Sequence, residues 1–107
     1  MNSTIVLKFG GTSVGSAARI MALPEIIKPY TKSYKQVIVV CSAMSKVTDL
    51  LIKAGEEASV HNPAYKKTVS DIKTKHNEAI RELFKQSKSI SKKVEDMLAE
   101  LEKIYEG

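Results

Sequence analysis

Two short segments hold the residue types that could do chemistry, and the first is residues 8–15 (KFGGTSVG). Gly10 and Gly11 let the backbone approach an anion with no Cβ in the way. The segment lies between an apolar run and a helix-like stretch, so N–H groups at the helix start would point at that anion. Lys8 adds a positive charge and Ser13 a hydroxyl donor. The pattern predicts phosphate binding, with a plain tight turn as the alternative; it is neither a P-loop nor a G-x-G-x-x-G fingerprint.

The second segment is residues 40–49 (VCSAMSKVTD), which also follows an apolar run and opens a helix-like stretch. Ser42, Ser45 and Thr48 could donate hydrogen bonds to a small carboxylate. The alternative is ordinary helix capping by serine and threonine. In open α/β sheets, ligands bind beyond the carboxyl ends of the strands, and both segments are predicted there.

The elements that must position these segments are two strands and a helix. Residues 3–9 and 35–41 are β-branched, nearly continuous apolar runs, which is typical of parallel strands covered on both faces. Residues 15–30 between them predict a helix that Pro24 must kink or break. The three elements form one βαβ unit, in which Cys41 is expected to be buried as a small hydrophobe. Two parallel strands need further partners, so the unit indicates the N-terminal piece of a larger fold.

The rest of the chain predicts helices. Thr48 is the expected N-cap of the first, and Asn62-Pro63 marks its end. Residues 64–106 then predict a helical hairpin with an apolar stripe on each helix. The first stripe consists of Tyr65, Val69, Ile72, His76, Ile80 and Leu83. The second consists of Ile90, Val94, Met97, Leu101 and Ile104. These stripes predict packing in a core or between subunits; a membrane-surface helix is disfavoured because the opposite faces mix lysine with glutamate.

Composition limits the function classes. The 107 residues carry a net charge of +5, from 17 basic and 12 acidic side chains. This charge does not predict nucleic-acid binding, because only Arg19 and Arg81 are arginines and aromatic residues are few. The charge is also spread along the chain: residues 1–60 hold seven basic and four acidic side chains, and residues 61–107 hold ten basic and eight acidic side chains. The single Cys41 allows no intrachain disulfide and indicates a reducing, cytoplasmic setting. No signal peptide, membrane span or metal-ligand cluster is visible, so neither a membrane nor a resident metal is expected.

The two segments together resemble a known family. Residues 8–14 (KFGGTSV), followed about 30 residues later by residues 42–51 (SAMSKVTDLL), resemble the N-terminus of the aspartate kinases, which are members of the amino-acid kinase family. The helical hairpin is similar to the helical insert of that family. The resemblance implies a three-layer αβα fold with a mainly parallel sheet, in which residues 1–60 form the βαβ phosphate- and aspartate-binding part and residues 64–106 the hairpin.

The resemblance also implies a reaction. The γ-phosphoryl group of ATP moves to the β-carboxylate of L-aspartate, which starts the route to lysine, threonine and methionine. Mg²⁺ would arrive with ATP and be held mainly by its phosphates, and a homo-oligomer is expected. The implied roles are charge stabilisation on the transferring phosphoryl group by Lys8, phosphate binding by Lys8, Gly10, Gly11 and Ser13, and aspartate binding by Ser42 and Thr48.

The sequence also departs from the family pattern. The His-Gly-Glu motif, the later Asp-containing glycine-rich segment, the adenine-binding region and the regulatory ACT domains are absent from the sequence. We therefore expect a fragment of an aspartate kinase that is inactive alone. Two alternatives stay open: another member of the amino-acid kinase family, and a non-catalytic helical module that associates through residues 64–106. The sequence does not decide whether the parent is fused to homoserine dehydrogenase or which end product inhibits it.

Overall fold

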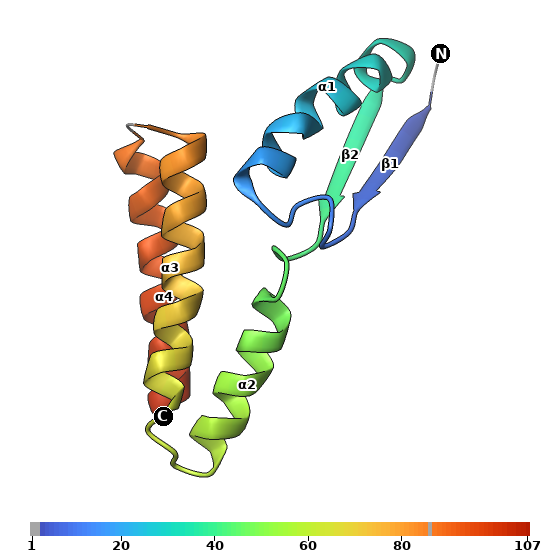
Figure 1. Ribbon diagram of the computed structural model, residues 1–107. Helices are drawn as coiled ribbons and strands as arrows, with labels where there is room; N and C mark the ends of the chain where they lie inside the picture. Colours follow the sequence, from blue (N-terminus) through green and yellow to red (C-terminus); the bar gives the residue numbers. More distant parts are fainter. Residues whose placement is uncertain (1–2, 86) are drawn as a thin grey trace. The chain divides into compact units, whose positions relative to one another are not determined.

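The computed structural model describes residues 3–85 and 87–107. Its elements follow the chain as strand β1 (Thr4–Phe9), helix α1 (Ala17–Ser33), strand β2 (Gln36–Cys41) and helices α2 (Val47–Ser59), α3 (Tyr65–Leu83) and α4 (Lys88–Glu106) (Figure 1). The order confirms the predicted βαβ unit followed by helices. The chain divides into two compact units, the first ending at Lys46 and the second beginning at Val47. Helix α2, which the sequence analysis grouped with residues 1–60, therefore packs with the hairpin helices.

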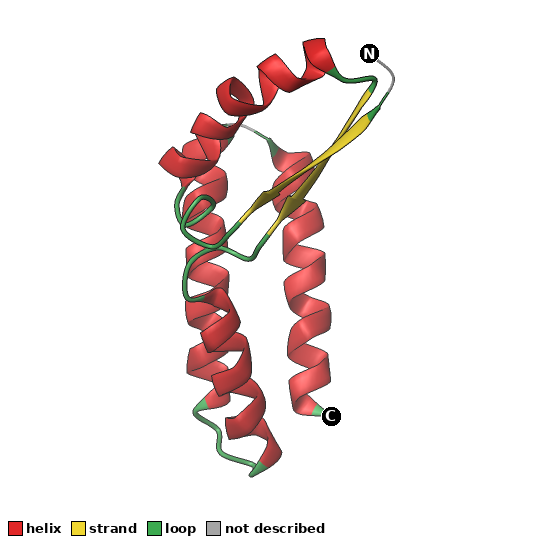
Figure 2. Ribbon diagram, turned by 90° about the vertical axis from the view of Figure 1, so that its right-hand side faces the viewer, coloured by secondary structure: helices red, strands yellow, loops and turns green. Residues whose placement is uncertain are grey.

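The first unit is a two-stranded parallel sheet with α1 as its crossover. The strands pair in register from Thr4 opposite Gln36 to Phe9 opposite Cys41. Valine and isoleucine dominate both strands because branched side chains fit the pleated surface of a sheet. Helix α1 lies along one side of the sheet (Figure 2). Both carboxyl ends therefore lie at the same edge of the sheet.

Helix α1 begins later and extends further than predicted. Ser16 takes the N-cap position, and its hydroxyl accepts a hydrogen bond from the Arg19 N–H at 3.3 Å. The helix then continues through Pro24 and Pro29 to Ser33, so Pro24 does not end it. Both prolines are exposed, which leaves their rings in solvent rather than against the sheet.

Strand β2 corrects the predicted burial. Val39 and Val40 are 40% and 43% exposed, and Ile38 is 48% exposed. Cys41, expected to be buried, is also exposed. The reason is architectural: one helix cannot cover both faces of a two-stranded sheet, whatever the hydropathy of its strands.

The second unit has a closed apolar core. Ala54 of α2 and Val69 and Ile72 of α3 are at most 1% exposed, and α2 packs against both α3 and α4. Val69, Ile72 and Ile80 confirm the predicted stripe on α3. His76 is half-buried beside them, with its Nδ1 2.7 Å from the Ile72 carbonyl oxygen.

Helix α4 faces this core with a different side from the one predicted. Leu98 is its buried residue, at 8% exposure, whereas Met97 and Ile104 of the predicted stripe are each 69% exposed. The helix is thus turned by about one residue, or roughly 100°, from the expected orientation. Val94 and Leu101 belong to the predicted stripe but also lie near the side that holds Leu98, and both are half-buried.

Polar contacts tie the three helices of the second unit together. The buried Thr68 hydroxyl of α3 donates to Glu57 Oε1 of α2 at 2.6 Å. Lys73 of α3 pairs with Glu102 of α4 at 2.7 Å. The Tyr105 hydroxyl donates to the Leu51 carbonyl of α2 at 2.8 Å. Burial raises the pKa of Tyr105 because the low-polarity surroundings disfavour the phenolate.

We expect Tyr105→Phe to destabilise the chain by about 1 kcal/mol at neutral pH, the usual net worth of a hydrogen bond. Because the folded-state pKa lies above the unfolded value, the contribution of Tyr105 is fully present below about pH 10 and is lost as pH rises through the folded pKa. Urea unfolding followed by circular dichroism, at neutral and strongly alkaline pH, measures both effects.

The difference between the two proteins should therefore shrink at alkaline pH. Tyr65→Phe is the matched control, because the Tyr65 hydroxyl donates to no residue among those that the structure describes. A difference that is absent at neutral pH, or unchanged at alkaline pH, would contradict the role assigned to the Tyr105 hydroxyl.

Candidate functional site

The two segments singled out in the sequence meet at the carboxyl edge of the sheet. Residues 10–16 leave β1 and residues 42–46 leave β2, and the Ser42 N–H donates to the Phe9 carbonyl at 2.9 Å. This bond extends the strand pairing into the second loop. The parallel sheet thus holds both loops side by side, as the predicted position of ligand sites requires.

Gly11 and Gly15 allow the two loops to touch. A Cβ on Gly15 would lie 3.1 Å from the Gly11 carbonyl oxygen and 3.3 Å from Ser45 Cβ, which is too close for an easy fit. A Cβ on Gly11 would be 3.9 Å from Ser42 Oγ, so Gly11 and Ser42 are direct neighbours. Gly10 has open space where its Cβ would be. Close packing therefore favours glycine at position 15, whereas a Cβ at position 10 would meet no neighbouring atom.

The first loop leaves backbone donors available. Its internal bonds run from the Val14 N–H to the Gly10 carbonyl at 3.2 Å and from the Gly15 N–H to the Thr12 carbonyl at 3.3 Å. The N–H groups of Gly11, Thr12 and Ser13 donate to no acceptor within the described part of the chain. Successive unpaired N–H groups in a turn make a concavity that attracts anions. The loop can therefore receive a phosphate through its backbone.

Lys8 is one residue from the end of β1. It lies opposite Val40 in the sheet and is exposed, on the same face as Val6. No carboxylate of residues 3–85 or 87–107 forms an ion pair with it. An ammonium group without a partner, close to the glycine loop, is suited to neutralising an anion.

Ser42 and Thr48 lie in different structural settings. Ser42 is exposed, and because α2 begins five residues later at Val47, it does not cap that helix. Thr48 belongs to the second unit, where it is the second residue of α2 and exposed. The predicted N-cap role of Thr48 is therefore wrong: Lys46 precedes the helix, with a left-handed φ of 69°. Placement of both hydroxyls in one pocket remains a prediction.

The sequence predicted backbone donors at the start of the helix, but α1 begins only at Ala17. The N–H groups that have no acceptor among the described residues lie earlier, in the loop that follows β1. The N–H groups of Gly11, Thr12 and Ser13 and the contact between Gly15 and Ser45 are visible only once the two loops are folded together. The adjacent glycines at positions 10 and 11 were the available signal for the first feature, and Gly15 was the signal for the second. Among the described residues, no cluster of histidine, cysteine and acidic side chains could hold a metal ion.

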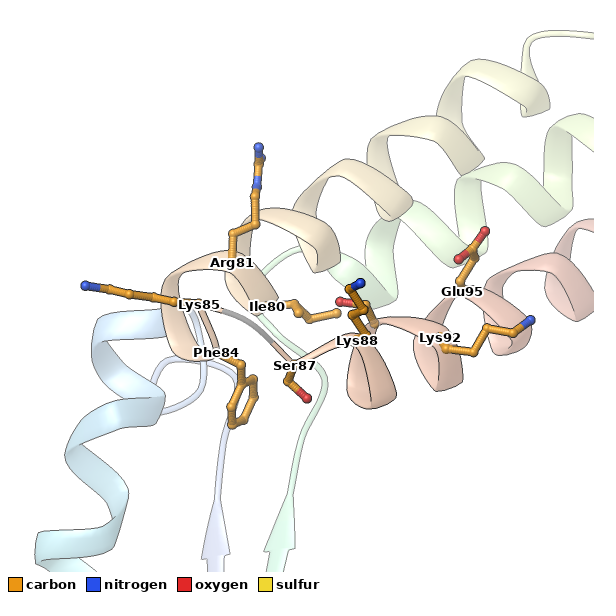
Figure 3. A pocket seen from close by; sticks show the side chains of 9 residues that line it. Ile80, Arg81, Phe84, Lys85, Ser87, Lys88, Lys92 and Glu95 are labelled. Carbon is orange, nitrogen blue, oxygen red and sulfur yellow. The ribbon is translucent and has the colours of Figure 1, made fainter.

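A hollow in the second unit was not predicted. It has a volume of about 960 Å³ and lies where α3 ends and α4 begins, away from both loops in the sequence (Figure 3). Four of its nine lining residues are basic, and the exposed ring of Phe84 contributes an apolar wall. The basic residues are Arg81, Lys85, Lys88 and Lys92.

The chain matches known proteins along nearly its whole length. The model of the amino acid kinase family matches residues 3–105. An aspartokinase of Bacillus sp. (strain MGA3) is 46% identical over 59 residues, which is 55% of this chain and 14% of the relative. Aspartokinase 2, chloroplastic, of Arabidopsis thaliana is 36% identical over 97 residues, or 88% of this chain and 18% of the relative.

A two-function relative matches as well. The bifunctional aspartokinase/homoserine dehydrogenase 2, chloroplastic, of Zea mays is 35% identical over 78 residues, which is 73% of this chain and 8% of the relative. The chain thus spans less than a fifth of the length of each of these relatives. No helix in the described ranges is both long and apolar enough to cross a membrane. The family match and the parallel βαβ arrangement agree, and the chain belongs to the amino acid kinase family.

Proposed function

We propose that the chain is the phosphate- and aspartate-binding part of an aspartate kinase. The observation that carries the proposal is the contact between the glycine loop and the Ser42 loop at one sheet edge. The reaction breaks the bond between the β,γ-bridging oxygen and the γ-phosphorus of ATP and joins that phosphorus to a β-carboxylate oxygen of L-aspartate. ADP and aspartyl phosphate result. The aspartokinase names of the relatives favour this substrate pair over another acceptor in the family.

The phosphates of ATP would lie on the first loop. Gly10 and Gly11 give them room, and the N–H groups of Gly11, Thr12 and Ser13 donate to their oxygens. Mg²⁺ would arrive with ATP and be held mainly by its phosphates. Lys8 would stabilise the negative charge on the transferring group, where positioning and charge neutralisation provide most of the catalysis.

The aspartate would lie on the side of the second loop. Ser42 Oγ borders Gly11, so a carboxylate bound by Ser42 would lie close to a phosphate bound by the glycine loop. Thr48 would add a second hydroxyl from the first turn of α2. This proximity is what direct transfer between two bound substrates requires.

Two wider features belong to the same proposal. The parent works as a homo-oligomer, which is supported by the apolar side chains that the chain leaves exposed on β2 and α4. It works in a reducing compartment, the cytoplasm, which is supported by the free, exposed thiol of Cys41.

In the full-length kinase, Lys8→Ala should lower kcat roughly 10²–10⁴-fold, because the interaction that it removes strengthens in the transition state. The variant should keep the melting temperature of the parent, since Lys8 is exposed. Lys35→Ala, a matched change at the other end of the strands, should leave kcat unchanged. Near-normal turnover of Lys8→Ala would remove Lys8 from the mechanism.

Ser42→Ala and Thr48→Ala should each raise the KM for aspartate roughly tenfold while the KM for ATP changes little. A hydrogen bond to a charged group is worth about 1.5–3 kcal/mol, which sets the size of the effect. Steady-state kinetics with each substrate varied in turn gives both constants, with Ser59→Ala at the far end of α2 as the control. Equal shifts for both substrates would count against an aspartate pocket.

The 107-residue chain alone should form no aspartyl phosphate. It spans 14% of the Bacillus relative, and the expected Glu-bearing and adenine-binding segments are not in its sequence. Each missing contact costs orders of magnitude in rate. Trapping the product as its hydroxamate tests this, with a full-length aspartokinase as the positive control; hydroxamate formed by the purified chain would refute it.

A further inference from the structure

The positive charge of the chain is concentrated where α3 turns into α4. Residues 81–93 hold five basic side chains and one acidic side chain, a net charge of +4 out of the +5 of the whole chain. The net charges of residues 1–60 and 61–107, +3 and +2, do not reveal this concentration. Figure 3 shows several of these basic side chains around the hollow at the turn. The five are Arg81, Lys85, Lys88, Lys92 and Lys93.

The remainder of α4 has the opposite charge. Residues 94–107 hold five acidic side chains and one basic side chain, a net charge of −4. The first turn of α4 contains no acidic residue, although a helix N-terminus favours negative charge. The charge order along α4 is therefore unfavourable for an isolated helix, and an antiparallel neighbour of the same charge order would offset it. Among the described residues, helix α3 meets this need only toward the acidic end of α4, through the ion pair between Lys73 and Glu102, because Arg81 at the end of α3 lines the same hollow as Lys88.

The side of α4 that holds Met97 exposes an apolar line. Ile90, Met97 and Ile104 follow one another at intervals of seven residues, which places them along one line of the helix. Met97 and Ile104 are each 69% exposed, and Ile90 is half-buried. Lys93 and Glu100 alternate with them along the same side, and neither forms an ion pair with a residue of the described ranges.

We propose that this side of α4 is a docking surface for α4 of a second copy of the chain, with the two helices antiparallel and related by a two-fold axis at Met97. Ile90 then lies level with Ile104 of the second copy, and the two Met97 side chains meet. Lys93 lies one residue, about 1.5 Å along the axis, from the level of Glu100 of the second copy. At this separation Lys93 and Glu100 of the second copy can form an ion pair, and the two-fold symmetry forms the same pair twice.

A second copy fits this surface because the surface is complementary to itself. Within α4 itself, the start carries a net charge of +3, from Lys88, Lys92 and Lys93, and the rest carries −4. The antiparallel arrangement places these opposite charges side by side, whereas a parallel pair would place like charges together. Lys92 is already paired with Asp96 at 2.8 Å, which leaves Lys93 as the basic group beside the apolar line. One helix pair lies at the low end of interface sizes, so the dimer should be weak and dependent on concentration. The dimer rests on the homo-oligomer of the proposed function and names the helix that would form it, and it does not depend on phosphoryl transfer.

Charge exchange tests the arrangement in the 107-residue chain, with sedimentation equilibrium as the measurement. Lys93→Glu and Glu100→Lys should each weaken dimerisation roughly tenfold, because each converts two attractive contacts into repulsive ones. The double variant Lys93→Glu/Glu100→Lys should restore the dimer. Lys53→Glu on α2, an exposed site with the same charge change, is the control and should have no effect. Circular dichroism verifies that all variants keep their helices.

Cross-linking tests the two-fold axis. In a Cys41→Ser background, Met97→Cys should form a disulfide-linked dimer under mild oxidation, because the axis brings this position against itself. Val60→Cys, at a site that is 71% exposed, should not. A chain that is monomeric at roughly 1 mM, a dimer indifferent to both charge variants, or equal cross-linking at the two sites would each overturn the proposal.

Discussion

The parallel pairing of β1 with β2 is the constraint on which the candidate site depends. A shift of the register by one residue would move every strand side chain to the other face and would separate the Ser42 N–H from the Phe9 carbonyl. With the observed register, both strands end together and their loops leave the sheet at one edge. The glycines then act within that frame, since the contact between the loops exists only where the sheet has already placed them.

The site combines two kinds of positive character. The unpaired N–H groups of Gly11, Thr12 and Ser13 provide fixed partial charges, which need no reorganisation when an anion arrives. In the proposed function, Lys8 would add a full charge on a flexible side chain that follows the transferring phosphoryl group. Backbone donors together with one lysine suit phosphoryl transfer, in which negative charge develops on the leaving oxygen and on the transferring group.

Sequence reasoning reached the parts of the molecule that local chemistry determines. The two strands and the two hairpin helices follow from the hydropathy period of the sequence, and the structure contains all four. Burial was harder, because it depends on which elements are available to cover a face. Cys41 has the neighbours of a core residue but is exposed on a sheet that one helix cannot cover. The core-facing side of α4 was also missed, since Met97 and Leu98 are equally apolar and adjacent, and only packing against α2 and α3 selects Leu98.

The two units differ in how completely they bury their own apolar residues. In the helical unit, Ala54, Val69 and Ile72 are enclosed, and hydrogen bonds join α2 to both neighbours, so its fold is supported from within. In the βαβ unit, Val39 and Val40 remain more than a third exposed although they lie at the centre of a continuous apolar strand. Exposed branched residues on a short sheet stabilise it little, because a sheet gains most of its stability from a buried face. The two candidate loops thus belong to the unit that buries fewer of its own apolar residues. Any contact that covers β2 therefore stabilises the pairing with β1, and with it the alignment of the glycine and Ser42 loops.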